Sequence, residues 1–297
     1  MSVAVLLSCH GTVSLTEDIP AFLHNIRRGR PTPPELVQEV AHRFELIGGS
    51  PLMSITEAQA RALEARLGVP VVVAGRLWHP YPGEVLPGLV AQGVRTLLSL
   101  PLAPQSVDVY HAAVREAAAP HPQLSLRYAP AWGLEPALLD AFVETIDEAL
   151  AAALEAERND IPIVLSAHSL PRRVIAAGDR YEIEFRAMAD AVAQRLRARG
   201  ATTSIAFQSQ GASAEPWLGP DLAETFAALA AAGARTALVA PIGFLAEHVE
   251  TLYDLDIEAP QIAQRAGLER LLRARAVCDR PRFIDAMEAV ARRALSA

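Results

Sequence analysis

Six short apolar runs recur along this 297-residue chain, and each is separated from the next by a longer amphipathic stretch. The runs cover residues 3–8, 69–74, 96–100, 161–166, 203–207 and 237–240. In the stretches between them apolar residues return at helical spacing, as in residues 136–158. Strands that are apolar on both faces and alternate with helices are typical of parallel βαβ units. The pattern therefore predicts an α/β protein with parallel, doubly wound sheets flanked by helices.

Two pairs of segments resemble each other within the chain. Residues 5–10 and 163–168 share the pattern Leu-Ser-x-His. Residues 91–101 and 231–241 share Ala, Gly, Arg, Thr, Leu and Pro at matching positions. Chance similarity between segments rich in Ala and Leu is the alternative. Because the two pairs occur in the same order, we infer a duplication.

The duplication predicts two similar Rossmann-like halves. We expect the halves to span residues 1–158 and 159–297, with the last helix able to pack back on the first half. Open α/β sheets bind their ligands at the carboxyl ends of the strands. Two such halves that face each other would therefore form a ligand-binding cleft between them.

Charge and cysteine content exclude several classes of function. The chain has 27 Lys and Arg against 34 Asp and Glu, a formal net charge of −7. A mildly acidic chain gains little from counterion release, so we expect no nucleic-acid partner. Two cysteines, Cys9 and Cys278, cannot by themselves hold a disulfide framework or an iron–sulfur cluster. Neither a signal peptide nor a membrane span is recognisable, and we expect a cytoplasmic protein.

Three histidines, His10, His168 and His248, lie near the ends of predicted strands. A single histidine at such a place is most often a structural hydrogen-bonding residue. Here two of the three occupy related positions of the repeat, which favours a shared site. Neutral imidazoles can accept protons near neutral pH or bind late first-row divalent metals.

Glu250 begins an acidic series that continues with Asp254 and Glu258. In a helix, a spacing of four residues places all three carboxylates on one face. A solvated acidic face is the alternative interpretation. Because the series begins beside His248, we interpret it as a path for a hydrated divalent cation. Zinc-type spacings such as His-Glu-x-x-His are absent, so we expect the metal to be a substrate in transit.

Basic and polar residues elsewhere are candidates for substrate binding. Arg27 and Arg28 belong to a basic loop, and guanidinium groups match the geometry of carboxylates, although a solvated surface run is the alternative. The glycine loop at residues 47–51 lacks the strand and helix context of a nucleotide-binding loop.

Eight motifs occur along the chain in the order typical of one family. They are LSCHGT at 7–12, IRRGR at 26–30, IGGSPL at 47–52, SAHSLP at 166–171, QSQG at 208–211, WLGP at 217–220, PIGF at 241–244 and EHVETLY at 247–253. With these motifs the chain resembles the ferrochelatase family, the lyases that insert ferrous iron into a porphyrin to make haem. The resemblance implies two chelatase-type halves with a porphyrin cleft between them.

The resemblance also implies roles for particular residues. His168 and Glu250 would form the catalytic pair, on opposite walls of the cleft. His248 would stand beside Glu250, and Asp254 and Glu258 would continue the series of metal-binding carboxylates. The residues expected to bind the porphyrin are His10, Arg27, Arg28, Ser50, Gln208, Ser209 and Trp217.

The chain departs from the family's pattern at several places. His10 stands where relatives often have Tyr or Met, and Glu247 stands where Asp is usual. The glycine loop is one residue shorter than usual, and the loop after Pro101 is trimmed. These departures bear on the choice of substrate and metal more than on the reaction.

Ferrous iron is expected as a substrate, with no tightly bound cofactor. The cysteine-bearing extension of cluster-containing members is absent, so we expect no iron–sulfur cluster. The expected partners are the porphyrin, ferrous iron and haem-accepting proteins. Residues 13–26 form an amphipathic stretch, which is more often a core-facing helix, and peripheral membrane contact is the alternative.

The chemistry of metal insertion agrees with these assignments. A free-base porphyrin carries two pyrrole N–H groups, and the metal enters only when the ring bends and both protons leave. We therefore assign His168 as proton acceptor or metal ligand and Glu250 as its partner in metal handling or proton removal. Protoporphyrin IX and coproporphyrin III are both candidate substrates. The alternatives are a cobalt or nickel chelatase for another tetrapyrrole and a non-catalytic carrier of porphyrin or haem.

Overall fold

The computed structural model describes residues 2–151, 153, 160–211 and 215–296. The chain divides into two compact units: the first is Met1–Trp132 with Cys278–Ala297, and the second is Gly133–Val277. The predicted boundary between residues 158 and 159 lies outside the described residues. Each unit has its own sheet, and each is described separately below.

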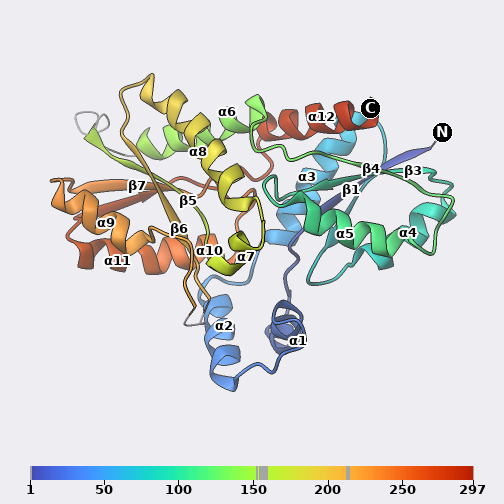
Figure 1. Ribbon diagram of the computed structural model, residues 1–297, viewed down its shortest axis with the longest axis horizontal. Helices are drawn as coiled ribbons and strands as arrows, with labels where there is room; N and C mark the ends of the chain where they lie inside the picture. The colour runs from blue at the N-terminus through green and yellow to red at the C-terminus, as the bar shows by residue number, and fades with distance from the viewer. Residues whose placement is uncertain (1, 152, 154–159, 212–214, 297) are drawn as a thin grey trace. The chain divides into compact units, whose positions relative to one another are not determined.

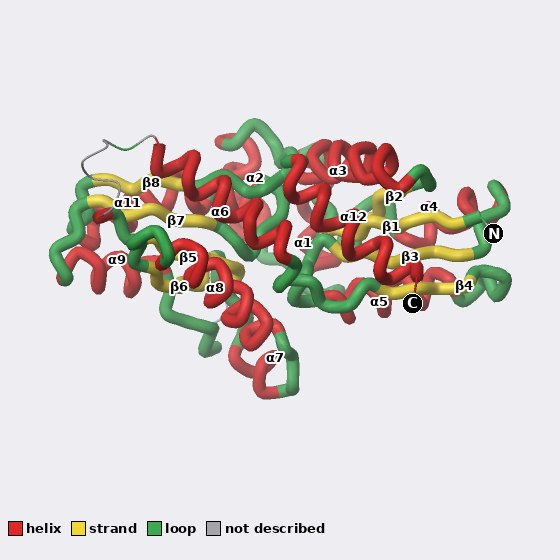
Figure 2. Tube along the Cα trace, turned by 90° about the horizontal axis from the view of Figure 1, so that it is seen from above, coloured by secondary structure: helices red, strands yellow, loops and turns green. Residues whose placement is uncertain are grey.

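The first unit contains a parallel sheet with the strand order β2-β1-β3-β4 (Figure 2). Its strands are β1 (Val3–Cys9), β2 (Val71–Gly75), β3 (Thr96–Pro101) and β4 (Ser125–Tyr128). Its helices are α1 (Ile19–Ile26), α2 (Pro34–Leu46), α3 (Leu52–Leu67), α4 (Pro82–Ala91), α5 (Val107–Ala118) and α12 (Pro281–Ser296), with a 3₁₀ turn, η1 (Thr16–Asp18), before α1. Helices α3 and α12 pack together on one face of the sheet, and α4 and α5 pack on the other (Figure 1).

Helix α12 returns from the end of the chain to the first unit, where it packs on α3. Phe283 and Met287 of this helix are fully buried, and burial of such a side chain contributes about 1.5–3 kcal/mol. Arg66 of α3 also pairs with Asp285 at 2.9 Å, but both side chains are about 40% exposed (44% and 39%). An exposed pair contributes at most about 1 kcal/mol, so apolar burial holds the helix in place.

The second unit contains a parallel sheet with the strand order β6-β5-β7-β8, which repeats the order of the first sheet (Figure 2). Its strands are β5 (Ile163–His168), β6 (Thr203–Gln208), β7 (Thr236–Ala240) and β8 (Arg270–Arg273). Its helices are α6 (Pro136–Ala151), α7 (Arg172–Ala176), α8 (Tyr181–Arg197), α9 (Leu222–Ala231), α10 (Val249–Leu252) and α11 (Ala259–Ala266), with a π-helical turn, η3 (Asp254–Glu258), after α10. Helix α6 packs on α8 and on β7, which is why it belongs to this unit.

The predicted fold class is confirmed, and all six predicted apolar runs are strands. Two further strands, β4 and β8, were not predicted. Both are four residues long, lie at a sheet edge and contain charged residues, in the sequences SLRY and RLLR. Most residues of β4 and β8 are exposed or only partly buried, so these two edge strands lack the continuous apolar run of the six predicted strands, which include the edge strands β2 and β6.

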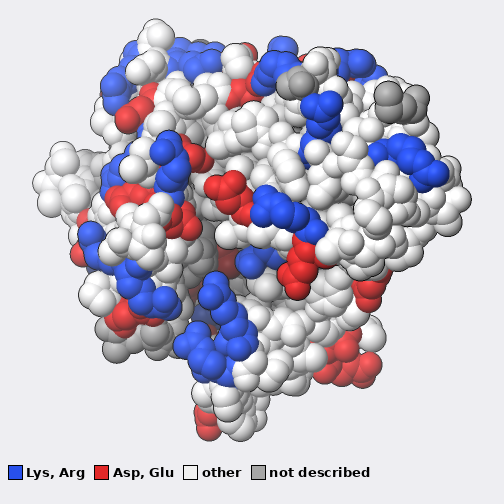
Figure 3. All heavy atoms as spheres, turned by 45° about the vertical axis from the view of Figure 1, so that its right-hand side comes forward, with Lys and Arg blue, Asp and Glu red and all other residues white. Residues whose placement is uncertain are grey.

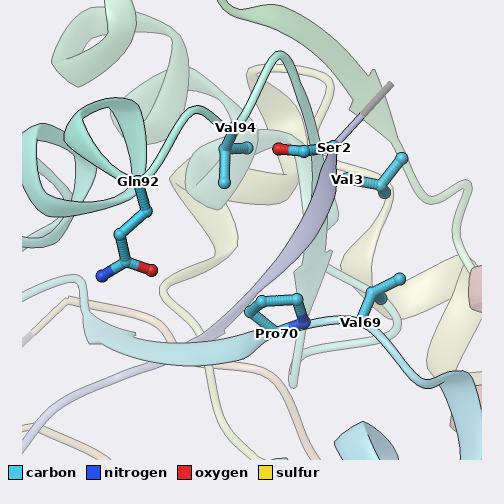
Figure 4. A pocket seen from close by; sticks show the side chains of 6 residues that line it. All are labelled: Ser2, Val3, Val69, Pro70, Gln92 and Val94. Carbon is cyan, nitrogen blue, oxygen red and sulfur yellow. The ribbon is translucent and has the colours of Figure 1, made fainter.

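A surface hollow of about 360 Å³ lies in the first unit and is lined by Ser2, Val3, Val69, Pro70, Gln92 and Val94 (Figure 4). These residues stand at the start of β1 or just before β2 and β3. The hollow therefore lies at the amino ends of the strands, opposite the edge where open α/β sheets bind ligands.

Acidic and basic side chains are interspersed on the face that Figure 3 shows. Residues 13–26 fold as η1 and α1, with Ile19, Phe22 and Leu23 buried. None of the helices in the described part of the chain is both long and apolar enough to cross a membrane.

Candidate active site

His168 and Glu250 are in direct contact in the second unit. His168 is the last residue of β5, and its Nδ1 lies 2.9 Å from Oε2 of Glu250 in the first turn of α10. The two side chains are about one third exposed (35% and 32%). The expectation that they stand on opposite walls of a cleft between the halves was wrong. The segment that carries Glu250 follows β7, the neighbour of β5 in the same sheet, so both residues come from one unit.

This contact fixes the state of the imidazole. A carboxylate only accepts hydrogen bonds, so His168 Nδ1 carries the proton and donates it to Glu250. Desolvation alone would lower the pKa of His168, but the charge and the hydrogen bond of Glu250 outweigh it, with a further contribution from Asp254. The net effect raises the pKa of His168 above its ordinary value. In the neutral ring the lone pair is then on Nε2.

Two residues that were not singled out in the sequence fix the backbone around His168. The hydroxyl of Tyr181 donates to the His168 carbonyl at 2.8 Å. Burial, and then the negative charges of Glu250 and Asp179, raise the pKa of Tyr181, so the hydroxyl remains a donor. Gly243 donates its N–H to the Ser166 carbonyl at 3.0 Å, and a Cβ there would lie 2.5 Å from that of Ala167. Only glycine lets this loop cross β5 so closely.

His248 caps helix α10. Its ring Nδ1 accepts a hydrogen bond from the Glu250 backbone N–H at 3.1 Å. The backbone N–H of His248 donates to Oγ1 of Thr251 at 3.0 Å. Burial lowers the pKa of His248, against the opposing effects of Glu250 and Glu247, so the ring remains a neutral acceptor. In this arrangement His248 Nδ1 serves the helix cap and orients Glu250, where the sequence had indicated a metal ligand.

Gln208 is enclosed within the protein instead of facing a substrate. Its side chain is buried; Oε1 accepts from the Ser166 hydroxyl at 2.7 Å, and Nε2 donates to the Glu250 carbonyl at 2.9 Å. The amide therefore links β5 to the start of α10. The next residue, Ser209, has a left-handed backbone (φ 59°) and donates its hydroxyl to Asp254. The sequence predicted both residues as porphyrin-binding and did not reveal that their side chains already pair within the protein.

The acidic series does not continue as a regular α-helix. After α10 the chain forms the π-helical turn η3, in which the Glu258 N–H donates to the Tyr253 carbonyl, five residues back, at 3.0 Å. The wider turn changes the angle between residues four apart, so the predicted common face does not hold. Such turns are frequent at functional sites. Asp254 is buried, whereas Asp256 is half exposed.

Within the described residues, no three His, Cys, Asp or Glu side chains are grouped so that they could hold a metal ion. The structure brings together His168 and Glu250 from the predicted set of five, with Asp254 close enough to affect the pKa of His168. It does not gather His248 and Glu258 with them into one ligand cluster.

Comparison with known proteins shows the family to which the chain belongs. The family model named Ferrochelatase matches residues 2–295, almost the whole chain. The chain belongs to the ferrochelatase family. It is thus a metal chelatase, a lyase that inserts iron into a porphyrin in haem synthesis.

Two relatives illustrate the range of the family. The ferrochelatase of Acidobacterium capsulatum is 36% identical over 98% of this chain and 94% of its own length. The coproporphyrin III ferrochelatase of a Geobacillus strain is 32% identical over 96% of each protein. Among solved structures, SirB from Bacillus subtilis with Fe³⁺ has a TM-score of 0.62 and 14% identity, covering 99% of this chain and 96% of its own. That similarity shows a shared fold.

The remaining residues predicted to bind the porphyrin are distributed over both units. In the first unit His10 follows β1, is exposed, and has Nδ1 3.1 Å from the Gly11 carbonyl. Arg27 and Arg28 are in the loop after α1; Arg27 Nε donates to the Pro31 carbonyl at 3.1 Å. Ser50 precedes α3, and its hydroxyl accepts from the Leu52 N–H at 3.5 Å.

In the second unit Trp217 lies against Gly211. A Cβ on Gly211 would come within 2.9 Å of the indole ring, so the glycine makes room for it. The Trp217 carbonyl accepts from Arg172 Nε at 3.2 Å, and the residue forms a β-bridge with Pro171. The tryptophan is therefore fixed to the loop that follows β5 and His168.

Proposed function

We propose that this chain inserts ferrous iron into a propionate-bearing porphyrin, with His168 Nε2 as the acceptor of the pyrrole protons. The observation that carries the proposal is the hydrogen bond from His168 Nδ1 to Glu250 Oε2 at 2.9 Å. It leaves the Nε2 lone pair available and provides a negative charge that stabilises the imidazolium once a proton has been taken up. Glu250 then acts as the residue that orients and stabilises His168.

The balance of the reaction fits these groups. Two N–H bonds of the porphyrin break, two protons leave, and one Fe²⁺ ion binds to the four ring nitrogens. No electron is transferred, so the reaction as written needs no redox cofactor. Because both side chains are about one third exposed (35% and 32%), each proton can pass from the imidazolium to water before the next is taken up.

We further propose that Asp254 and Glu258 conduct the incoming cation, since carboxylates and imidazole are ligands that ferrous iron accepts. The guanidinium groups of the exposed Arg28 and the half-buried Arg27 suit the propionates of the porphyrin. Both protoporphyrin IX and coproporphyrin III carry such groups. We place the reaction in the cytoplasm, with haem-accepting proteins as the recipients of the product.

The test is anaerobic insertion of Fe²⁺ into protoporphyrin IX and coproporphyrin III side by side, with wild type and Glu250→Gln. The substitution keeps the shape of the side chain and removes the charge that stabilises the imidazolium. We expect kcat to fall about 100-fold, the size typical of a lost proton-transfer partner. Glu269→Gln, in an exposed pair with Arg235 in the same unit, is the matched control and should leave kcat unchanged.

Two results would overturn the proposal. The first is a Glu250→Gln protein that metallates at the wild-type rate. The second is a wild-type protein that binds porphyrin tightly without forming the iron complex, which would support a carrier instead. Insertion of cobalt or nickel into another tetrapyrrole, with porphyrins untouched, would select the other chelatase.

A further inference from the structure

Arg273 connects two segments on either side of Glu250, the hydrogen-bond partner of His168. It is the last residue of β8, and its side chain is only 11% exposed. Nε donates to Asp256 Oδ1 at 2.8 Å and Nη2 donates to Asp256 Oδ2, which makes a two-pronged ion pair with the π-helical turn. Nη1 donates to Glu247 Oε1 at 2.6 Å. One guanidinium group thus holds two carboxylates.

The two carboxylates, Glu247 and Asp256, stand at the two ends of the segment that carries Glu250, residues 247–256, called the active segment below. Glu247 comes three residues before Glu250, and Asp256 comes six residues after it. Glu247 Oε1 also accepts the Ala276 N–H at 2.9 Å, so the start of the segment is tied to the chain that follows β8 as well. Both ends of the active segment are therefore held by one side chain, that of Arg273 at the end of β8.

We propose that Arg273 is a positioning residue for the chelatase reaction: by fixing Glu247 and Asp256 it keeps Glu250 Oε2 within hydrogen-bond distance of His168 Nδ1. The inference rests on the proposed function for its kinetic consequences. Arg273 acts through the segment, because its own contacts are with the residues that flank Glu250. It has no part in the proton transfer itself.

The chemistry of the guanidinium group explains why position 273 is an arginine. A guanidinium group is planar and presents donors in a fixed fork, so it can bind Asp256 through two nitrogens and still reach Glu247 with the third. A lysine ammonium group is a single point of charge and cannot hold both carboxylates in this geometry. Burial alone would raise the pKa of Glu247, but Arg273 and the hydrogen bonds around it outweigh burial and lower it, which keeps the pair charged.

A matched ion pair exists at the other end of the same two strands. Arg235 precedes β7 and Glu269 precedes β8, and their side chains pair while remaining 77% and 60% exposed. This pair lies at the amino ends of the strands, away from α10 and η3. It is therefore a control for the loss of an arginine–carboxylate pair that does not hold the active segment.

The experiment measures kcat and KM for anaerobic iron insertion in Arg273→Lys, Asp256→Asn and Arg235→Ala. We expect kcat to fall about tenfold in Arg273→Lys and about fivefold in Asp256→Asn, because small misplacements of reacting groups cost that much or more. KM for the porphyrin should stay within about twofold, and Arg235→Ala should match wild type in both constants. Arg273→Lys keeps a charge beside the buried Glu247, and Asp256→Asn leaves that pair intact, so both variants are expected to fold.

A second readout does not depend on activity. In protein labelled with ¹⁵N-histidine, the His168 Nδ1 proton that is donated to Glu250 gives a downfield signal, assigned by its loss in His168→Ala. We expect this signal in wild type and in Arg235→Ala, and its weakening or loss in Arg273→Lys and Asp256→Asn. If the ion pairs of Arg273 only stabilised the fold, Arg273→Lys and Asp256→Asn would lower the melting temperature and leave this signal and kcat unchanged.

The outcomes separate the two proposals. Loss of kcat at constant KM together with loss of the signal supports Arg273 as a positioning residue. Wild-type kcat and an unchanged signal in both variants overturn it, and so does a rise in KM alone. If the wild type itself fails to insert iron, the proposed function falls, and the histidine signal still decides whether Arg273 positions Glu250.

Discussion

The two sheets have the same strand order, yet the histidines at the ends of their related strands have different surroundings. In the second unit His168 donates to Glu250, which comes from the segment after β7. In the first unit His10 has Nδ1 beside the carbonyl of its own neighbour Gly11, and its ring is nearly perpendicular to that of Phe22. The repeated strand supplies a histidine in both units. The segment after the third strand of the second unit supplies the carboxylate.

The serines two residues earlier show the same contrast. Ser166 donates its hydroxyl to Gln208, the residue that pairs with His168 in the strand register. The Ser8 hydroxyl is buried and has no hydrogen-bond partner among the residues that the structure describes. In the first sheet Arg76 follows Gly75, the register partner of Cys9, so it stands at the position related to Gln208. Arginine has no acceptor, so it cannot receive the hydroxyl as glutamine does. One substitution at the second strand thus removes the link on which the site depends.

The largest effect should separate the two histidines. We expect His168→Ala to lower kcat about 100-fold or more, because the proton acceptor is lost. We expect His10→Ala to leave kcat nearly unchanged and to raise KM, as for a residue that contributes only to substrate binding. Steady-state kinetics of anaerobic iron insertion measure both constants. Equal losses of kcat in the two variants would mean that both histidines contribute alike, which would contradict the difference between the two units.

The sequence predicted the central strands because each is an apolar run buried on both faces, as in β1 and β5. It missed β4 and β8 because these two strands are only four residues long, are largely exposed or partly buried and carry no such run. Missing β8 also meant missing Arg273, since nothing marked that arginine as part of a strand beside α10. Spacing along the sequence could not have revealed it, because only the folded sheet brings Arg273 into contact with Asp256 and Glu247.

For the site, the sequence named His168 and Glu250 but not their contact. The two are 82 residues apart, and only the adjacency of β5 and β7 brings them together. The helical spacing rule failed at Asp254 and Glu258 because a π-helical turn leaves no periodic pattern of its own. The burial of Gln208 could not be read from its type, since a glutamine at a strand end serves a substrate or the protein equally well.

A smaller effect should separate the two serines. Ser166→Ala removes a donor and leaves the buried Oε1 of Gln208 without its partner, which costs about 1–3 kcal/mol. Ser8→Ala removes a buried hydroxyl that has no partner in the described part of the chain, so the free energy of unfolding of this variant should be equal to or above that of wild type. Urea unfolding measures both values. Ser166→Ala should also lower kcat, because Gln208 holds the Glu250 backbone. Equal destabilisation in the two variants would contradict the contrast.

The smallest effect is the pH dependence of stability, and here the two units should differ in sign. The pKa of His168 is raised, chiefly by Glu250 acting against desolvation. Its contribution is therefore fully present below the unfolded-state pKa of about 6.5 and is lost as the pH rises through the folded-state pKa. With the imidazole 35% exposed, solvent screening keeps this contribution below about 1 kcal/mol.

His111 of the first unit should behave in the opposite way. It is buried between the Ser99 hydroxyl (2.8 Å) and the Ala129 carbonyl (2.9 Å), and burial lowers its pKa despite the hydrogen bond to Ala129. The folded protein then binds fewer protons at this ring than the unfolded chain, so stability falls as the pH drops below about 6.5. Urea unfolding of wild type, His168→Gln and His111→Gln from about pH 5 to about pH 8 tests both signs. The stabilisation of wild type over His168→Gln should shrink with rising pH, and that over His111→Gln should grow. If the two stability differences changed with pH in the same direction, the charge of Glu250 would not dominate the pKa of His168. The two histidines would then give no reason to treat the two units as chemically distinct.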